Sequence, residues 1–249
     1  GDESNLFSLA SNILVPFSNR ISGGGFEWNR MHYPLTPNMS NESFPIHGDG
    51  FQKVWENVDV DEGCRMILPN GTFGPWRYGA EQVLNLSPGS LQMTLTLINK
   101  GEIILPFGCG FHPWFPRYKD TKLSFVAETI WMEDTSHLPT KELPISEASD
   151  WRFDQPRTLP EKLINNGYTG WCGTARIEQG RNAVSCSLTA SKNLKTAIVY
   201  SPYSGSDFFC FEPVSHPVDA FHLPGRPGLV ELAPGDSMIA SMTISWKQE

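Results

Sequence analysis

Apolar and polar residues alternate along two long segments of the chain. Every second residue is apolar in residues 91–97 (Leu91, Met93, Leu95 and Leu97) and in residues 238–246 (Met238, Ala240, Met242, Ile244 and Trp246). Successive side chains of a β-strand point to opposite faces. The alternation therefore predicts two strands that each bury one face.

Four shorter segments also have the composition of strands. They are rich in β-branched or aromatic residues, are separated by clusters of Gly, Pro, Asn or Ser, and cover residues 122–127, 183–190, 196–200 and 207–211. Asn70-Gly71 has the sequence of a hairpin turn, and the pattern leaves room for one short helix at most, over residues 159–165. We therefore predict an all-β fold, a large sandwich of mainly antiparallel strands, in a single domain over residues 1–249.

The two longest segments without strand character are residues 28–43 and 131–160. Long loops in compact domains often carry function. We expect these two loops to border the functional site.

Composition agrees with a folded chain that is rich in turns. The 249 residues include 22 Gly, 20 Pro, 15 Phe, 8 Trp and 6 Tyr, and 39% are hydrophobic, which excludes a disordered chain. No stretch of 18 apolar residues occurs, so we predict no membrane span. The net charge of −8 and the lack of a basic cluster argue against a nucleic-acid partner.

The five cysteines are odd in number, widely spaced and never in a C-x-x-C arrangement. This pattern argues against a disulfide framework and against a structural zinc site. The first ten residues open with acidic rather than basic side chains, unlike a signal peptide. We therefore expect a cytoplasmic protein with reduced thiols.

Three segments place an ionisable side chain beside Gly or Pro, at residues 44–50, 108–115 and 208–217, which contain His47, His112 and Glu212. Glu212 ends an apolar run, and burial there would raise the pKa of its carboxyl group toward that of a general base. Pro213 is expected to end the strand and to fix the direction of the carboxylate.

A structural role is the alternative for each of these residues. A histidine in apolar sequence is more often part of a core, and a glutamate beside proline is more often a solvated charge at a strand edge. No two histidines have the close H-x-H or H-x-x-x-H spacing of metal ligands, so we predict no metal site.

Taken in chain order, these segments resemble the aldose 1-epimerase (galactose mutarotase) family. The resemblance rests on Asn19-Arg20-Ile21, Gly25-Phe26, His47-Gly48, His112-Pro113-Trp114-Phe115, Glu212-Pro213, Ala220-Phe221 and Leu232-Ala233-Pro234-Gly235. Each motif is short, but their order and separations cover nearly the whole chain. The resemblance implies the large antiparallel sandwich of galactose mutarotase, with an open cleft for a small-molecule sugar and with no cofactor or metal.

The resemblance also implies a role for each site residue. It makes Glu212 the general base on the C1 hydroxyl and His112 the acid that protonates the ring oxygen. His47 and Arg20, with Asn19 beside them, are expected to bind and orient the sugar oxygens. Ring opening, rotation about C1–C2 and closure on the other carbonyl face would then exchange the α and β anomers.

The chain departs from the family pattern in two places. A family aspartate that binds sugar hydroxyls is replaced by Asn165, followed by Asn166, which keeps hydrogen-bonding capacity but loses the charge. Few residues precede Asn19, so we expect N-terminal strands of the family to be missing. The sheet edge is then exposed, rebuilt or covered by a partner chain, which leaves a homo-oligomer open.

Two other functions fit the same motifs. One is a carbohydrate-binding or sensing protein that keeps the cleft without turnover. The other is a phosphosugar 1-epimerase, which needs a basic cluster near the cleft; the candidate suppliers are Arg20, Arg30, Arg117 and Lys119.

Overall fold

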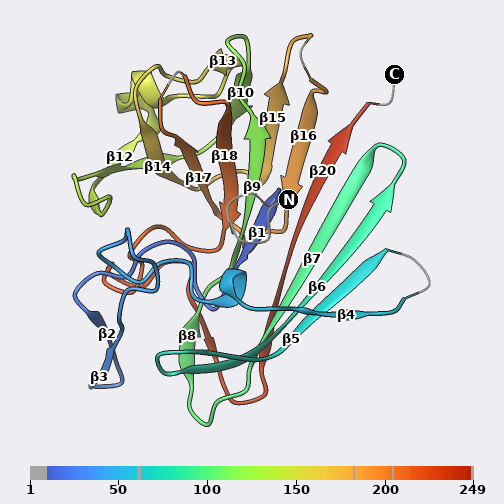
Figure 1. Ribbon diagram of the computed structural model, residues 1–249. Helices are drawn as coiled ribbons and strands as arrows, with labels where there is room; N and C mark the ends of the chain where they lie inside the picture. The colour runs from blue at the N-terminus through green and yellow to red at the C-terminus, as the bar shows by residue number, and fades with distance from the viewer. Residues whose placement is uncertain (1–9, 61–62, 182, 204, 248–249) are drawn as a thin grey trace.

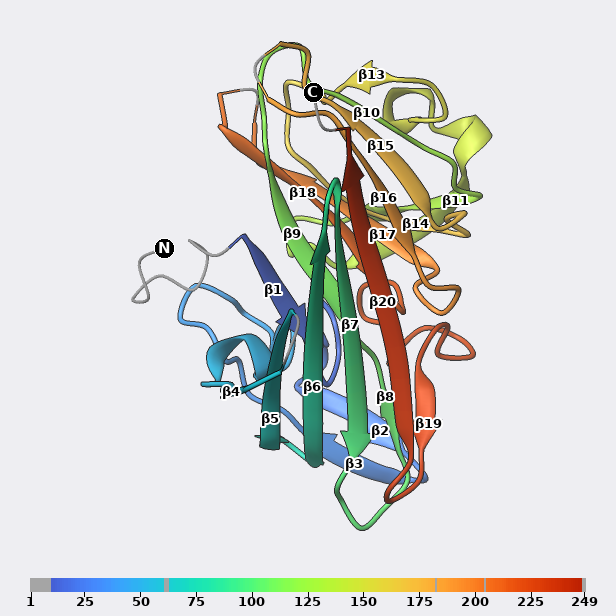
Figure 2. The same cartoon turned by 90° about the vertical axis from the view of Figure 1, so that its right-hand side faces the viewer.

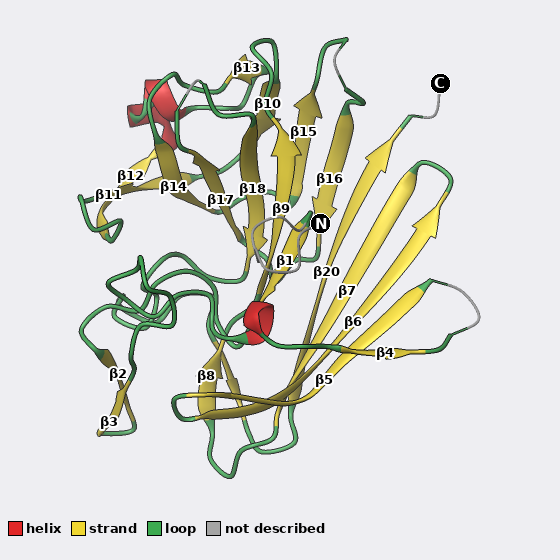
Figure 3. Cartoon of the chain, in the orientation of Figure 1, coloured by secondary structure: helices red, strands yellow, loops and turns green. Residues whose placement is uncertain are grey.

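The computed structural model describes residues 10–60, 63–181, 183–203 and 205–247, and within them the chain is almost entirely β-structure (Figures 1 and 3). The first sheet has seven strands in the order β1 (Ser11–Leu14), β9 (Gly110–Pro116), β18 (Phe208–Val214), β17 (Thr196–Ser201), β14 (Ile164–Thr169), β11 (Thr129–Glu133) and β12 (Pro139–Pro144). The second has nine, in the order β13 (Arg157–Thr158), β10 (Lys122–Phe125), β15 (Thr174–Glu178), β16 (Cys186–Ala190), β20 (Ser237–Trp246), β7 (Ser90–Asn99), β6 (Trp76–Ser87), β5 (Cys64–Phe73) and β4 (Glu56–Val58).

Smaller elements complete the described chain. Two two-stranded sheets pair β2 (Gly25–Trp28) with β3 (Met31–Pro34) and β8 (Leu105–Phe107) with β19 (Val230–Leu232), and three 3₁₀ turns form η2 (Gly50–Gln52), η3 (Ile145–Glu147) and η4 (Ser149–Trp151). Neighbouring strands of the two large sheets run antiparallel, as in β1 with β9 and β20 with β7. In the described part of the chain, no helix has the length and apolar character needed to cross a membrane.

The two large sheets lie face to face (Figures 1 and 2), and aromatic side chains pack between them. The ring of Phe125 on β10 lies 4.9 Å from that of Tyr168 on β14 and 5.1 Å from that of Phe211 on β18, in edge-to-face contacts. Such pairs stabilise a core beyond the apolar area that they bury. The all-β antiparallel sandwich predicted from the sequence is confirmed.

The two alternating segments form β7 and β20, which are neighbours in the second sheet. Their apolar faces meet in register, with Leu95 opposite Ala240 and Met93 opposite Met242, and all four side chains are buried. The strict period of two is thus the consequence of one core face and one outer face.

Two local predictions were wrong, and one was an upper limit. Residues 159–165, where the pattern left room for one short helix at most, contain none, and Ile164 and Asn165 already belong to strand β14. Asn70-Gly71 lies within β5, at an irregularity of its pairing with β6, and the chain turns instead at residues 74–75. Gly71 is needed there because a Cβ atom would lie 2.2 Å from the ring of Tyr78. The loops expected at 28–43 and 131–160 contain the strands β3, β12 and β13.

The N-terminal edge, where leading strands were expected to be missing, is formed by β1. This strand pairs with β9 and buries Ile13 and Leu14. The segment that follows β1 carries Asn19 and Arg20, and at Pro16 it still contacts the chain that leads into β9, because the N–H of Gly108 donates to the carbonyl oxygen of Pro16.

Candidate functional site

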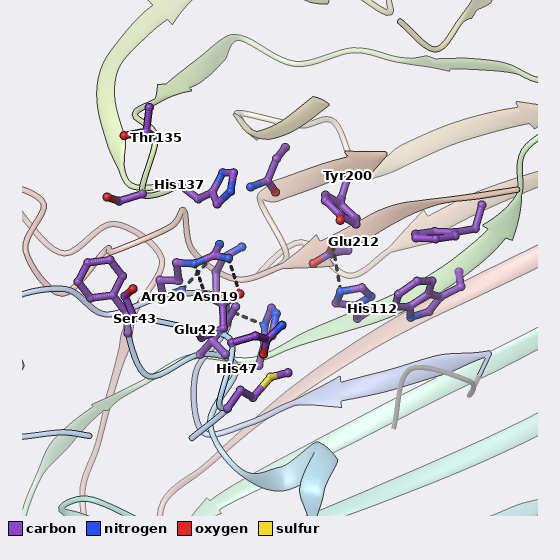
Figure 4. A pocket seen from close by; sticks show the side chains of 18 residues that line it. Asn19, Arg20, Glu42, Ser43, His47, His112, Thr135, His137, Tyr200 and Glu212 are labelled. Carbon is purple, nitrogen blue, oxygen red and sulfur yellow. Dashed lines mark hydrogen bonds and ion pairs between the residues drawn. The ribbon is translucent and has the colours of Figure 1, made fainter. Parts of the chain in front are cut away.

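A cavity of about 530 Å³ opens over the first sheet and is lined by all six residues predicted from the sequence: Asn19, Arg20, His47, His112, Asn165 and Glu212 (Figure 4). Residues from both predicted border loops also line it, including Glu42 and Ser43 from one loop and Thr135 and His137 from the other. The fold therefore brings together side chains that are almost 200 positions apart in the sequence. What each of them does remains a prediction at this point.

His112 and Glu212 lie on the neighbouring strands β9 and β18, where the pairing of these strands is interrupted. Paired residues end at Cys210–Trp114 and resume at Val214–Gly110. Each site residue precedes a proline, which has no N–H to donate to a ladder. The side chains meet across this gap, with Nε2 of His112 at 3.3 Å from Oε1 of Glu212 (Figure 4).

Pro213 does not end its strand, contrary to the prediction. Strand β18 continues to Val214, and Pro213 pairs with Ala197 of β17. Proline is tolerated inside this central strand because the ladder on the opposite side, toward β9, is already broken there.

Burial sets the protonation of this pair. The side chain of Glu212 is almost fully buried, which raises the pKa of its carboxyl group to about 8, although the charge of Arg20 acts in the opposite direction. Burial lowers the pKa of His112 to about 4. Between these values the pair holds one proton, resting on Glu212 and within reach of His112. The second oxygen of Glu212, Oε2, has no hydrogen-bond partner among the described residues and is free to meet a ligand.

His47 has its tautomer fixed by the backbone. Its Nδ1 atom accepts a hydrogen bond of 3.0 Å from the N–H of Asn19, so in the neutral ring the proton is on Nε2. Burial, assisted by the charges of His112 and Arg20, lowers the pKa of His47 well below its usual value. His47 thus lines the cavity as a neutral donor.

The backbone at His47 is left-handed, and the glycine that follows it fits only without a side chain. Its φ of 61° lies in the left-handed region, and Gly48 follows at a φ of 63°. A Cβ atom on Gly48 would lie 2.1 Å from the carbonyl oxygen of Val15, so only glycine fits there. The predicted His-Gly motif is therefore a requirement of the backbone.

Arg20 is held by a carboxylate that the sequence did not single out. Its Nε and Nη2 atoms donate to Oε2 and Oε1 of Glu42 at 2.9 and 2.8 Å, a bidentate pair. Glu42 lies in a loop that is itself fixed by Asn38, whose Nδ2 donates to the carbonyl oxygens of Ile46 and Gly48 and whose Oδ1 accepts from the N–H of Ile46. The guanidinium group is thereby positioned before any ligand binds.

Asn165 forms part of the opposite wall. Its Nδ2 atom donates to Oε2 of Glu133 at 2.9 Å, and the same oxygen lies 3.1 Å from Nδ1 of His137. Asn166 instead donates to the carbonyl oxygen of Trp131 and does not line the cavity. Of the two adjacent amides, only Asn165 lines the cavity.

One group of side chains has the atoms for metal binding. Donor atoms of His112, Cys210 and Glu212 lie within 4.8 Å of one another. Burial and the charge of Glu212 raise the pKa of the Cys210 thiol well above its usual value, and the deprotonated thiolate is the form that binds metals. The group is therefore suited to holding protons rather than a cation.

The cavity lacks the basic cluster that phosphate recognition needs. Among its described lining residues Arg20 is the one Lys or Arg, and Glu42 already pairs with it. Arg117 donates to the carbonyl oxygens of Tyr203 and Pro160, away from the cavity lining. The remaining candidates, Arg30 and Lys119, are exposed and do not line the cavity either.

This chain is similar to a known protein family, to a curated protein and to solved structures. The family model for aldose 1-epimerase matches residues 3–245. The chain is 35% identical over 240 residues to the uncharacterized protein YphB of Escherichia coli (strain K12), covering 93% of this chain and 81% of YphB. A crystal structure from Escherichia coli K12, described provisionally as an aldose 1-epimerase, has a TM-score of 0.91 and 32% identity, covering 99% of this chain and 87% of that one. A galactose mutarotase-like protein from Clostridium acetobutylicum shares the fold, with a TM-score of 0.84 and 16% identity, covering 96% of this chain and 79% of that one.

Proposed function

Because the chain belongs to the aldose 1-epimerase family, we propose that it is an isomerase that interconverts the α and β anomers of an unphosphorylated aldose. The observation that carries the proposal is the contact of 3.3 Å between His112 and Glu212 at a cavity that also contains His47 and Arg20. One acid and one base, buried side by side, are what ring opening of a cyclic sugar requires.

The reaction begins from the form of the pair in which the proton has moved from Glu212 to His112. The Glu212 carboxylate takes the proton of the C1 hydroxyl, the bond from C1 to the ring oxygen breaks, and His112 protonates that oxygen. The open aldehyde rotates about C1–C2. Closure on the other face returns the first proton to O1 from Glu212 and the second to Nε2 of His112, so both groups regain their starting state.

Fixed polar groups orient the sugar for these steps. The Nε2–H of His47 and the guanidinium group of Arg20 donate to sugar oxygens, and neither has to be reoriented because Asn19 and Glu42 already hold them. Placing reacting groups in advance lowers the entropic part of the barrier. Acid and base catalysis would each contribute roughly 10²- to 10⁴-fold to the rate.

The proposed function and its two alternatives predict different results when anomer exchange and binding are measured with the same sugars. Anomer exchange is measured by NMR or polarimetry with a panel of aldoses, and the proposal requires acceleration over buffer that is lost in Glu212→Gln. A non-catalytic sugar-binding protein would bind the same aldoses in calorimetry without accelerating exchange. A phosphosugar epimerase would prefer phosphorylated aldoses, which the pairing of Arg20 with Glu42 does not favour.

A further inference from the structure

Behind the wall of the cavity that carries Asn165 lies a carboxylate that the proposed mechanism does not use. Glu133 is the last residue of β11, and its Oε2 atom contacts both Asn165 and His137, which line the cavity. We propose that Glu133, acting through Asn165 and His137, makes the site select aldoses whose C3 and C4 substituents are neutral or cationic over aldoses with an anionic substituent there. This inference rests on the proposed function, because it describes the substrate of the same site.

The hairpin that carries this wall is rigidly built. Oδ1 of Asp134 accepts hydrogen bonds from the N–H groups of Ser136 and Leu138, at 2.8 and 3.1 Å, and the backbone of Asp134 pairs with that of Leu138 and with the N–H of His137. His137 adopts a φ of 61°, which is uncommon for a residue other than glycine. A strained conformation that the turn enforces is typical of functional positions.

The contacts of Glu133 determine what Asn165 and His137 present to a ligand. Because Nδ2 of Asn165 donates to Glu133, the amide oxygen is the atom left to accept hydrogen bonds. Nδ1 of His137 lies 3.1 Å from Oε2 of the same carboxylate, so this ring also stands in the field of Glu133. Burial raises the pKa of Glu133, whereas His137, Arg20 and Asn165 favour its charged form.

The charges around the cavity are unequal. Glu42 lines it and is paired with Arg20, the one permanent cation among the described lining residues, whereas Glu133 stands directly behind the wall. Because Arg20 is already bound to Glu42, no lysine or arginine of the described lining is left to pair with Glu133. A further anion brought to this wall meets a like charge.

The position of the wall defines which part of the sugar it contacts. In Figure 4, His137 and Thr135 lie apart from His112 and Glu212 in the cavity that all four line. In a pyranose ring, C4 lies opposite C1 and C3 lies opposite the ring oxygen. A sugar whose C1 lies at Glu212 and whose ring oxygen lies at His112 therefore turns C3 and C4 toward Asn165 and His137.

Three sugars that differ at one position test this selection: D-glucose, D-glucose 3-sulfate and 3-amino-3-deoxy-D-glucose. At pH 7 we expect kcat/KM for the sulfate to be at least about tenfold below that for glucose, mainly through KM, and we expect the amino sugar to match or exceed glucose. One unit charge at a distance of a few ångströms near a protein surface produces an effect of about this size. The ratio of kcat/KM for glucose to kcat/KM for the sulfate should fall as ionic strength rises.

Glu133→Gln isolates the charge, because the amide oxygen that replaces the carboxylate can still accept from Asn165. We expect this variant to reduce the discrimination against the sulfate by about tenfold. The double variant Glu133→Gln with Asn165→Asp returns a carboxylate to the same wall from the neighbouring strand and should restore the discrimination. Glu142→Gln is the matched control, since Glu142 is exposed on β12 and contacts Thr129 outside the cavity lining.

Several outcomes overturn the inference while leaving the proposed function intact. They are equal kcat/KM for all three sugars in the unmodified protein, unchanged discrimination in folded Glu133→Gln, or failure of the folded double variant to restore it. The salt dependence needs no variant and tests the inference even if a substitution prevents folding. If no sugar is turned over, the proposed function fails. The affinities of the three sugars, measured by calorimetry, then test whether the site selects against the anionic one.

Discussion

Nε2 of His112 and Oε1 of Glu212 lie 3.3 Å apart across a gap in the pairing of two adjacent strands, and burial shifts the pKa values of the two groups in opposite directions. The pair therefore keeps one proton over a wide range of pH. Below the pKa of His112 it holds two protons and has no base, and above the pKa of Glu212 it holds none and has no acid.

The first prediction is a bell-shaped dependence of kcat/KM on pH. The acid limb should fall near pH 4 and the alkaline limb near pH 8, the values set by burial for His112 and Glu212. Initial rates of anomer exchange between about pH 3.5 and 9.5, corrected for the buffer reaction, measure it. A rate that increases steadily to the alkaline end of this range would show that no protonated group is required.

The second prediction concerns the two catalytic candidates together. Glu212→Gln and His112→Asn should each lower kcat by at least about 10²-fold, because each removes one proton-transfer group. The double variant should be little worse than the poorer single variant, since the groups act as a unit. Glu231→Gln, at an exposed position of β19, serves as the control. Full additivity would indicate two independent contributions.

The third prediction concerns stability in acid. His47, His112 and His216 are buried with lowered pKa values, so unfolding takes up protons as the pH falls from about 6.5 toward 4 and stability is lost in that window. Glu212, whose pKa is raised, acts in the opposite direction between about 4.5 and 8, and Glu133, whose pKa is also raised, opposes the histidines above about 4.5. The three histidines outnumber these two carboxyl groups, so stability should fall by roughly 1.4 kcal/mol per pH unit for each net proton. Urea unfolding at pH 7, 6 and 5 measures this slope.

The contribution of one residue, His216, to the loss of stability in acid can be tested separately. Its Nε2 atom accepts from the N–H of Ser18, and its Nδ1 faces the carbonyl oxygen of Pro217, which fixes a neutral ring. His216→Leu should cost about 1–3 kcal/mol at pH 7, because the buried N–H of Ser18 loses its acceptor. It should also flatten the acid slope; a slope equal to that of the unmodified protein would remove His216 from the explanation.

The fourth prediction concerns the glycine after His47. Gly48→Ala should destabilise the fold by about 1–3 kcal/mol and raise KM, because the new methyl group collides with the carbonyl of Val15 and displaces His47. Gly235→Ala is the control: its φ of 88° is also left-handed, but a Cβ atom there meets nothing within 4 Å. Equal destabilisation by both variants would attribute the effect to backbone strain alone.

Much of the fold could be predicted from the sequence because two periodic strands carry the signal. Met93 and Leu95 on β7 and Ala240 on β20 must all face one core, and this requirement is visible as strict alternation. Asn70-Gly71 was misinterpreted because the same dipeptide suits a turn or a bulge, and the ring of Tyr78 decides between them. That contact lies between two strands, so the residues next to Gly71 in the sequence do not predict it.

Three of the predicted site residues, His47, His112 and Glu212, stand in short motifs in which a histidine or glutamate precedes Gly or Pro, and the others follow from the family resemblance. Glu42 and Glu133 have no such neighbours, and each matters through a partner elsewhere in the chain: Arg20 for the first, Asn165 for the second. The available signal was weaker, namely that both loops were expected to border the site. Pairing between distant loops depends on the folded geometry and is not encoded in local spacing.

The hydrogen bonds of Asn38 have a consequence for how tightly a small ligand is held. A monosaccharide offers few contacts, so a loop that had to become ordered on binding would consume much of the interaction free energy. Here the side chain of Asn38 joins residues 46 and 48 before the ligand arrives, and Glu42 and His47 lie in the same loop. Association should consequently show a small heat-capacity change and a rate close to that of an open, rigid receptor.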